Sequence, residues 1–113
     1  MTKYLISFDD GSMDHIPAEN LPEVGEAAHN VVRAAEAAGV WIFGAGLHTQ
    51  QASIVATDGT VTVGPYPETK AVLGGFSIIE VPTREDALEW AAKIAAACRC
   101  PQEVRELFYD PES

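Results

Sequence analysis

The stretch GFSIIEVPTREDALEWAAKIAAAC, residues 75–98, decides the fold. Its first seven residues, 75–81, are apolar on both alternating faces, which is typical of a strand that is covered on both sides. Thr83 and Asp86 then have the spacing of a capping box, and Pro101 lies where it would end a helix. Between these limits apolar residues recur every three or four positions, which predicts a helix with one buried stripe. The stripe comprises Ala87, Leu88, Ala91, Ile94, Ala95 and Cys98.

The first half of the chain also predicts a strand and a helix, followed by a second strand. Residues 3–9, KYLISFD, alternate with a period of two and predict a strand. Asn20 and Glu23 have capping-box spacing after an acidic loop, and Gly39 stands where a left-handed helix end belongs. Residues 40–46, VWIFGAG, predict a second strand that is apolar on both faces. The stripe of the intervening helix comprises Val24, Ala28, Val31, Ala35 and Ala38.

A hairpin and a long connection join the two halves. Residues 52–63, ASIVATDGTVTV, contain two β-rich runs around Asp58-Gly59, a pair that favours the positive φ of tight hairpin turns. Residues 64–75 form a connection longer than most loops in compact domains. Residues 103–109, EVRELFY, predict the last strand. The complete order predicts an α+β fold, ferredoxin-like with split βαβ halves and an inserted β-hairpin.

The length and the apolar surface predict one domain that assembles with a copy of itself. A chain of 113 residues is the size of one domain, here residues 1–113. Both helices would cover one face of the sheet and leave the apolar second face of strands 40–46 and 75–81 without a cover. A second sheet covers such a face most simply. We therefore expect a homodimer whose sheets pack face to face, with a cleft or barrel interior near the interface.

Charge and composition exclude some partners and locations. The chain has 7 Lys+Arg against 17 Asp+Glu, a formal net charge of -10, so we expect no binding to nucleic acid or to anionic membrane surfaces. No apolar run reaches the roughly 18 residues needed to span a bilayer, and the amino terminus lacks the apolar centre of a signal peptide. Cys98 and Cys100 lie too close in sequence for an unstrained bridge. These features predict a cytoplasmic protein.

Residues 64–91, GPYPETKAVLGGFSIIEVPTREDALEWA, resemble the signature region of the DGPF proteins within the YCII-related superfamily. The opening KYLISF, the segment AAGVWIFGAGL and the final RCP occur in that family's order, so the resemblance covers nearly the whole chain. It implies a ferredoxin-like α+β fold assembled as a dimeric α/β barrel. Val63 stands where the namesake motif has Asp, and Tyr66 stands in place of Phe, so any role of that Asp is absent here.

The resemblance also implies a catalytic candidate, His29. Relatives are proposed to carry out cofactor-free chemistry through a His on the first helix and an acidic residue, and an imidazole suits this role because it titrates near neutral pH. His29 shares a helical stripe with three charged residues, which is also typical of a solvated, charge-paired helix face. These are Glu26, Arg33 and Glu36. Both interpretations of His29 stay open.

Three further residues are candidates for binding a substrate. Tyr66 and Lys70 lie in the long connection, where a phenol and an ammonium would orient a small polar group over an apolar cleft. The alternative is a connection whose glycines and prolines only set its shape. His48 follows the end of a predicted strand, and it either lies near the cleft mouth or is an exposed loop histidine.

No metal or nucleotide site is predicted. Cys98 and Cys100 supply two ligands, and no His lies at the spacing of a companion ligand. The glycines of GAG and LGG lack the strand-loop-helix context of a phosphate-binding loop. We therefore expect a protein that works without a cofactor.

Two functions from different classes are consistent with these features. The first is a small enzyme in which His29 transfers protons on a small, partly apolar molecule, while Tyr66 and Lys70 position it or stabilise developing negative charge. The second is a non-catalytic dimeric module that binds a metabolite or regulates a partner, since some relatives are linked to extracytoplasmic-function sigma factors. A cofactor-free monooxygenase is a third interpretation, from fold analogy alone.

Overall fold

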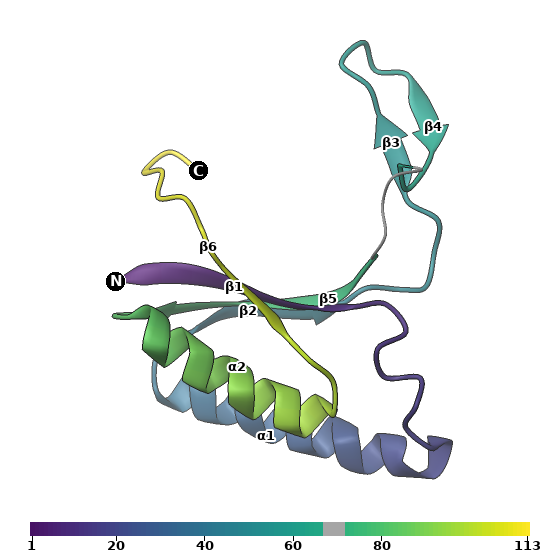
Figure 1. The fold of residues 1–113 in the computed structure, drawn as a ribbon. Coiled ribbons are helices and arrows are strands. Elements are labelled where there is room, and N and C mark those ends of the chain that lie inside the picture. Colours follow the sequence, from purple (N-terminus) through teal and green to yellow (C-terminus); the bar gives the residue numbers. More distant parts are fainter. Residues whose placement is uncertain (67–71) are drawn as a thin grey trace.

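The computed structural model describes residues 1–66 and 72–113. Two helices pack on one face of a four-stranded antiparallel sheet, whose strands lie in the order β2-β5-β1-β6 (Figure 1). The strands are β1 (Thr2–Asp9), β2 (Trp41–Gly46), β5 (Leu73–Val81) and β6 (Glu103–Glu106), and the helices are α1 (Leu21–Ala37) and α2 (Arg84–Cys98). This arrangement confirms the predicted α+β class and is compatible with the ferredoxin-like fold.

The core lies between α2 and the two central strands. Tyr4 on β1 pairs with Ile79 on β5, and both side chains are almost fully buried beneath the helices. Ala87 and Ala91 of α2 are buried against them, and their small side chains let the helix approach the sheet closely. Ile6 is completely buried beside this cluster. The alternation along β1 and the stripe of α2 therefore meet in one apolar layer.

The predicted signals mark three of the four helix ends, including the end of α2, which stops at Cys98 shortly before Pro101. Thr83 Oγ1 accepts a hydrogen bond from the backbone N–H of Asp86 at 3.1 Å, which confirms the predicted cap of α2. Gly39 has φ +76°, which confirms the left-handed end after α1. The predicted cap at Asn20 is wrong, because Asn20 has helical backbone angles, ends a short 3-10 helix (Ala18–Asn20), and makes no side-chain capping bond within the described chain.

Two further predictions are corrected at the surface. Leu88, predicted on the buried stripe of α2, is 44% exposed, because the helix faces the sheet mainly through Ala87 and Ala91. The last strand ends at Glu106 and does not reach residue 109. The N–H of Leu107 still donates to Lys3 O, and continuing this register would place Thr2, the first residue of β1, opposite Phe108, so residue 109 has no β1 residue opposite it.

The second face of the sheet is open in the single chain. Ile42 and Phe43 of β2 are 47% and 55% exposed, so residues 1–66 and 72–113 of one chain do not provide the predicted cover on both sides of this strand. Phe43 packs against Phe76 of β5 with ring centroids 6.0 Å apart. The edges β2 and β6 stay apart in sheet order, so one chain does not close a barrel.

The inserted hairpin is confirmed and forms its own two-stranded sheet, β3 (Ser53–Val55) with β4 (Val61–Val63). Gly59 has φ +89° in the turn, as the Asp58-Gly59 pair predicts. The backbone N–H of Thr60 donates to Asp58 Oδ1 at 2.9 Å and lowers the pKa of that carboxyl. The hairpin projects from the sheet on the side opposite the helices (Figure 1).

Candidate functional site

A cavity of about 230 Å³ lies between the helices and the sheet, next to β2. Phe8 on β1 and Trp41 on β2 contribute two aromatic walls, and Val32 on α1 and Ile94 on α2 contribute aliphatic ones. The predicted strand and helix alternation explains this composition, because the inward faces of both layers are apolar. Concave, mostly apolar cavities with few polar groups are typical of sites for small molecules.

Four polar side chains face this cavity: His29, Ser77, Cys98 and Gln102. Burial, and secondarily the neighbouring Cys100, raise the pKa of the Cys98 thiol, so this group is a neutral thiol near pH 7. Gln102 Nε2 donates to the carbonyl oxygen of Cys100 at 3.4 Å, which holds the amide at the end of α2. The cavity therefore presents an imidazole, a hydroxyl, a thiol and an amide against apolar walls.

The structure places His29 at the mouth of this cavity, with its side chain still exposed to solvent. The charge-paired stripe predicted around it also exists, because Arg33 Nη1 lies 3.4 Å from Glu26 Oε1 and donates to Asn30 Oδ1. This pairing lies beside His29 and does not include it. Among the described residues that line the cavity, none is an Asp or a Glu. The acidic partner that the family resemblance implies is therefore not beside His29 in this set.

The other predicted substrate-binding residues lie apart from His29. Tyr66 is 62% exposed and does not line the cavity. His48 is exposed in the segment after β2 and does not line it either. Lys70 lies outside the described residues. The described residues thus bring one of these predicted site residues, His29, to the cavity.

Two glycines shape the aromatic walls of the cavity. A β-carbon at Gly44 would lie 2.6 Å from the ring of Trp41, and a β-carbon at Gly75 would overlap the ring of Phe8. Neither glycine has a positive φ. Their lack of a side chain is therefore required by the close approach of the rings rather than by the backbone conformation.

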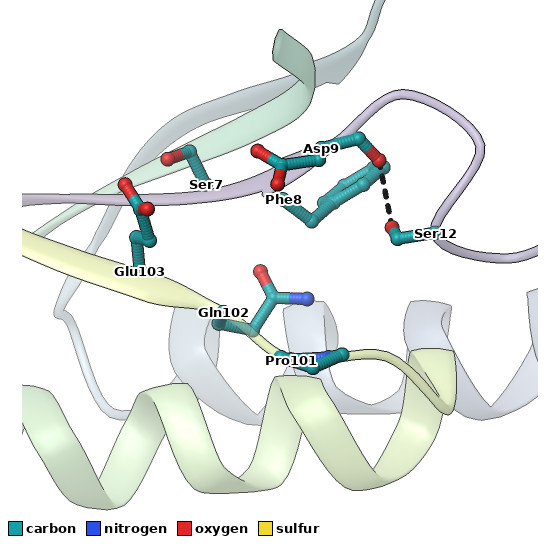
Figure 2. A pocket seen from close by; sticks show the side chains of 7 residues that line it. All are labelled: Ser7, Phe8, Asp9, Ser12, Pro101, Gln102 and Glu103. Atoms are coloured by element: carbon teal, nitrogen blue, oxygen red, sulfur yellow. Dashed lines mark hydrogen bonds between the residues drawn. The ribbon is translucent and has the colours of Figure 1, made fainter. Parts of the chain in front are cut away.

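A second cavity of about 190 Å³ lies between the end of β1 and the start of β6, and five of its seven lining residues are polar. Figure 2 shows Ser7 and Asp9 from β1 facing Gln102 and Glu103, while Ser12 donates from its hydroxyl to Asp9 O at 2.7 Å. Phe8 and Gln102 line both cavities.

Sequence reasoning missed this second cavity because its carboxylates lie far apart in the chain. These are the carboxylates of Asp9 and Glu103. In the β1–β6 register Glu103 pairs with Ser7, and Asp9 lies two residues after Ser7 on β1. Each carboxylate by itself belongs to an ordinary polar position of a loop or a strand end, so no sequence pattern marks the pair.

Within residues 1–66 and 72–113, no group of three or more His, Cys, Asp or Glu side chains is arranged to hold a metal ion. Cys98 and Cys100 are both free thiols. No helix in the described part of the chain is long and apolar enough to cross a membrane.

Comparison with known proteins identifies the family. The sequence pattern of the YCII-related domain matches residues 5–107, which take in all but the first three residues of β1 and every later helix and strand of the fold. A search of curated protein sequences finds none that matches this chain. The chain therefore belongs to the YCII-related domain family.

Proposed function

We propose that this protein binds a small, largely apolar molecule in the cavity beside β2 and that His29 exchanges a proton with it. The observation that carries the proposal is the position of His29 at the mouth of a cavity whose other walls are mainly aromatic and aliphatic. An imidazole beside an apolar site both contacts the ligand and reaches water, which a proton-transfer group requires. The closer resemblance to DGPF proteins, carried by residues 64–91, agrees with a cofactor-free site.

The other polar groups of the cavity suit orientation rather than nucleophilic attack. Cys98 is a neutral thiol, and a thiolate is the form in which cysteine attacks. Ser77 and Gln102 offer hydrogen bonds at the apolar wall, where such bonds fix the direction of a ligand. We assign proton transfer to His29: its ring nitrogen takes a proton from the ligand, and the imidazolium returns it to the ligand or to water.

The test combines binding with isotope exchange. Small aromatic and aliphatic carbonyl compounds are screened by ligand-observed NMR, and bound compounds are then incubated with protein in D₂O. We expect deuterium uptake with the wild type and with His48→Gln, a matched exposed histidine away from the cavity, and its loss with His29→Gln while binding persists. Unchanged uptake in His29→Gln would refute the catalytic role. Val32→Trp, which fills the cavity, should abolish binding, and binding that survives it would place the ligand elsewhere.

A non-catalytic binding module is the second candidate. It is favoured by the lack of an Asp or a Glu beside His29 among the described lining residues, since a carboxylate usually orients a catalytic imidazole. In this case the net charge of -10 would suit a basic protein partner, in line with the sigma-factor link of some relatives. Ligand binding that survives His29→Ala, with no compound altered or deuterated, would select this candidate.

We also propose that two copies pair through the open face of the sheet. The exposed ring of Phe43, which packs on the half-buried ring of Phe76, supports this, because apolar side chains of this size on one open face mark an interface. Light scattering coupled to size exclusion should give twice the mass of one 12.1 kDa chain. Phe43→Asp should shift the equilibrium to monomer, and a wild-type monomer at all concentrations would refute the dimer.

A further inference from the structure

The inserted hairpin has an exposed apolar face of its own. Val55 pairs with Val61, and Val63 lies two residues further along β4, so the three side chains share one face of the two-stranded sheet. They are 66%, 62% and 71% exposed. Residues 47–66, which carry this hairpin, are called the arm below. An isolated two-stranded hairpin is marginally stable in water, so a face of three valines needs a partner.

The arm finds no such partner within the described chain. Among the described strands, β3 and β4 pair with each other and with no other strand, and the arm extends away from the sheet (Figure 1). The radius of gyration is 15.8 Å, compared with about 13 Å for a compact chain of this length. The excess is consistent with a segment whose packing surface lies outside its own chain.

The carboxyl-terminal end has a second exposed apolar segment. Residues 107–113, called the tail, follow β6, and the last backbone bond to the sheet runs from Leu107 N–H to Lys3 O. Phe108 and Tyr109 then stand 92% and 82% exposed. The tail and the arm rise on the same side of the sheet, opposite the helices, and from opposite ends of it (Figure 1). Between them lies the open face that carries Phe43.

Two exposed segments at opposite ends of an open face leave two symmetric ways to add a second copy face to face. A twofold axis that is parallel to the sheet and runs along the line from arm to tail places each arm beside the partner's arm and each tail beside the partner's tail. A twofold axis that is parallel to the sheet and perpendicular to that line places each arm beside the partner's tail. Both are isologous arrangements, and both close the assembly at two copies.

Charge favours the second arrangement. Residues 103–113 contain four carboxylates, Glu103, Glu106, Asp110 and Glu112, against the single cation Arg105, which already lies 2.6 Å from Glu103. Two such segments side by side would repel each other. The arm contains one carboxylate, Asp58, and no Lys or Arg. A nearly neutral, valine-faced arm is thus the better neighbour for an acidic segment that carries two exposed aromatic rings.

We infer that, in a dimer, the valine face of each arm packs on Phe108 and Tyr109 of a second copy of this chain. The inference rests on the dimer proposed above and adds which segments meet across it. Phe43, Tyr66, Phe108 and Tyr109 together expose on the order of 500 Å² if each side chain carries roughly 150–250 Å². With the three valines this approaches the ~800 Å² per partner of a standard interface.

The direct test is an isotope-filtered NMR experiment on a mixed dimer. Chains with ¹³C-labelled valine methyl groups are mixed with unlabelled chains, and nuclear Overhauser effects between the two are recorded. We expect effects from the methyls of Val55, Val61 and Val63 to the rings of Phe108 and Tyr109. Single Val→Ile substitutions assign the methyls. Intermolecular effects that join arm to arm, or that leave the tail rings out, would overturn the inference.

Dimer dissociation provides an independent measurement. Val61→Thr with Val63→Thr keeps the branched shape that suits a strand while adding hydroxyls, and it should raise the dimer Kd at least tenfold, as should Phe108→Ser with Tyr109→Ser. Leu88→Ser is the matched control, since Leu88 is 44% exposed on α2, on the helix side of the sheet, and should leave Kd unchanged. A wild-type monomer would refute the proposed dimer and this inference with it. A dimer with unchanged Kd in both double variants would refute the arm–tail contact alone.

Discussion

The ring of Phe8 occupies the space that a side chain at Gly75 would fill. The two residues are direct neighbours across β1 and β5. Phe8 also forms part of the wall of both cavities, with Gln102. The absence of a side chain at Gly75 therefore determines where the ring lies, and so shapes the cavity that holds His29.

Gly75→Ala should displace the Phe8 ring and destabilise the fold. The new methyl overlaps the ring and also meets Ala45 O at 3.2 Å, and overpacking of this kind costs about 1–3 kcal/mol. Gly46→Ala is the matched control, because Gly46 pairs with Gly75 across the sheet but a β-carbon there meets no atom of the described residues within 4 Å. Urea unfolding of both variants measures the difference. Equal stabilities would show that the Phe8 ring moves aside without cost.

Ile6→Ala should be the most damaging of the simple truncations. The Ile6 side chain has no exposure at all, so its removal leaves a cavity in the core and should cost about 2–5 kcal/mol of unfolding free energy. Leu88→Ala, at a position that is 44% exposed, should change stability by less than about 0.5 kcal/mol. Thermal and urea unfolding test both. A large loss of unfolding free energy in Leu88→Ala would mean that Leu88 is buried, as the stripe of α2 predicts.

The two helix starts should respond differently to loss of their polar residue. Thr83→Ala removes the bond that Oγ1 accepts from the N–H of Asp86 and should cost about 1 kcal/mol. Thr83→Ser should restore most of this. Asn20→Ala removes no capping bond and should cost only a few tenths of a kcal/mol on the same scale. Comparable losses in the two alanine variants would contradict the observed geometry.

The Cys98 thiol should make the protein less stable in alkali. Burial raises its pKa in the folded chain above the ordinary value of 9.0, so the unfolded chain releases this proton first. The contribution to stability is complete below pH 9 and declines as the pH rises from there through the folded pKa. Unfolding free energies at pH 7 to 10.5 should fall more steeply for the wild type than for Cys98→Ala. Parallel curves would mean that the thiol ionises equally easily in both states.

Features with local causes were predicted correctly. The Asp58-Gly59 turn, the positive φ of Gly39 and the Thr83 cap each depend on residues within three or four positions. Asn20 shows the limit of such reasoning, because it has a suitable side chain and spacing but the chain enters α1 through a 3-10 turn. A suitable residue and spacing are therefore not sufficient for a cap.

The position of His29 in the candidate site depends on tertiary packing, which local sequence signals do not describe. Sequence and resemblance named His29 but left open whether it faced a cavity or solvent, because its helical stripe also carries the Arg33–Glu26 pair. Its position depends on how far α1 stands from β2, and hence on the size of side chains elsewhere, such as the absent one at Gly44. Helical periodicity states which residues share a face, but not which neighbouring element that face meets.

The order of strands and helices was determined by the sequence alone, because the periods of apolar residues and the turn residues act through neighbours in the chain. The tertiary structure decided which distant residues meet: Phe8 with Gly75, Ser7 with Glu103, and His29 with the aromatic cavity. It also left the valines of the arm and the rings of the tail exposed. Such contacts depend on sheet register and on the distance between layers, which arise only when all elements pack together.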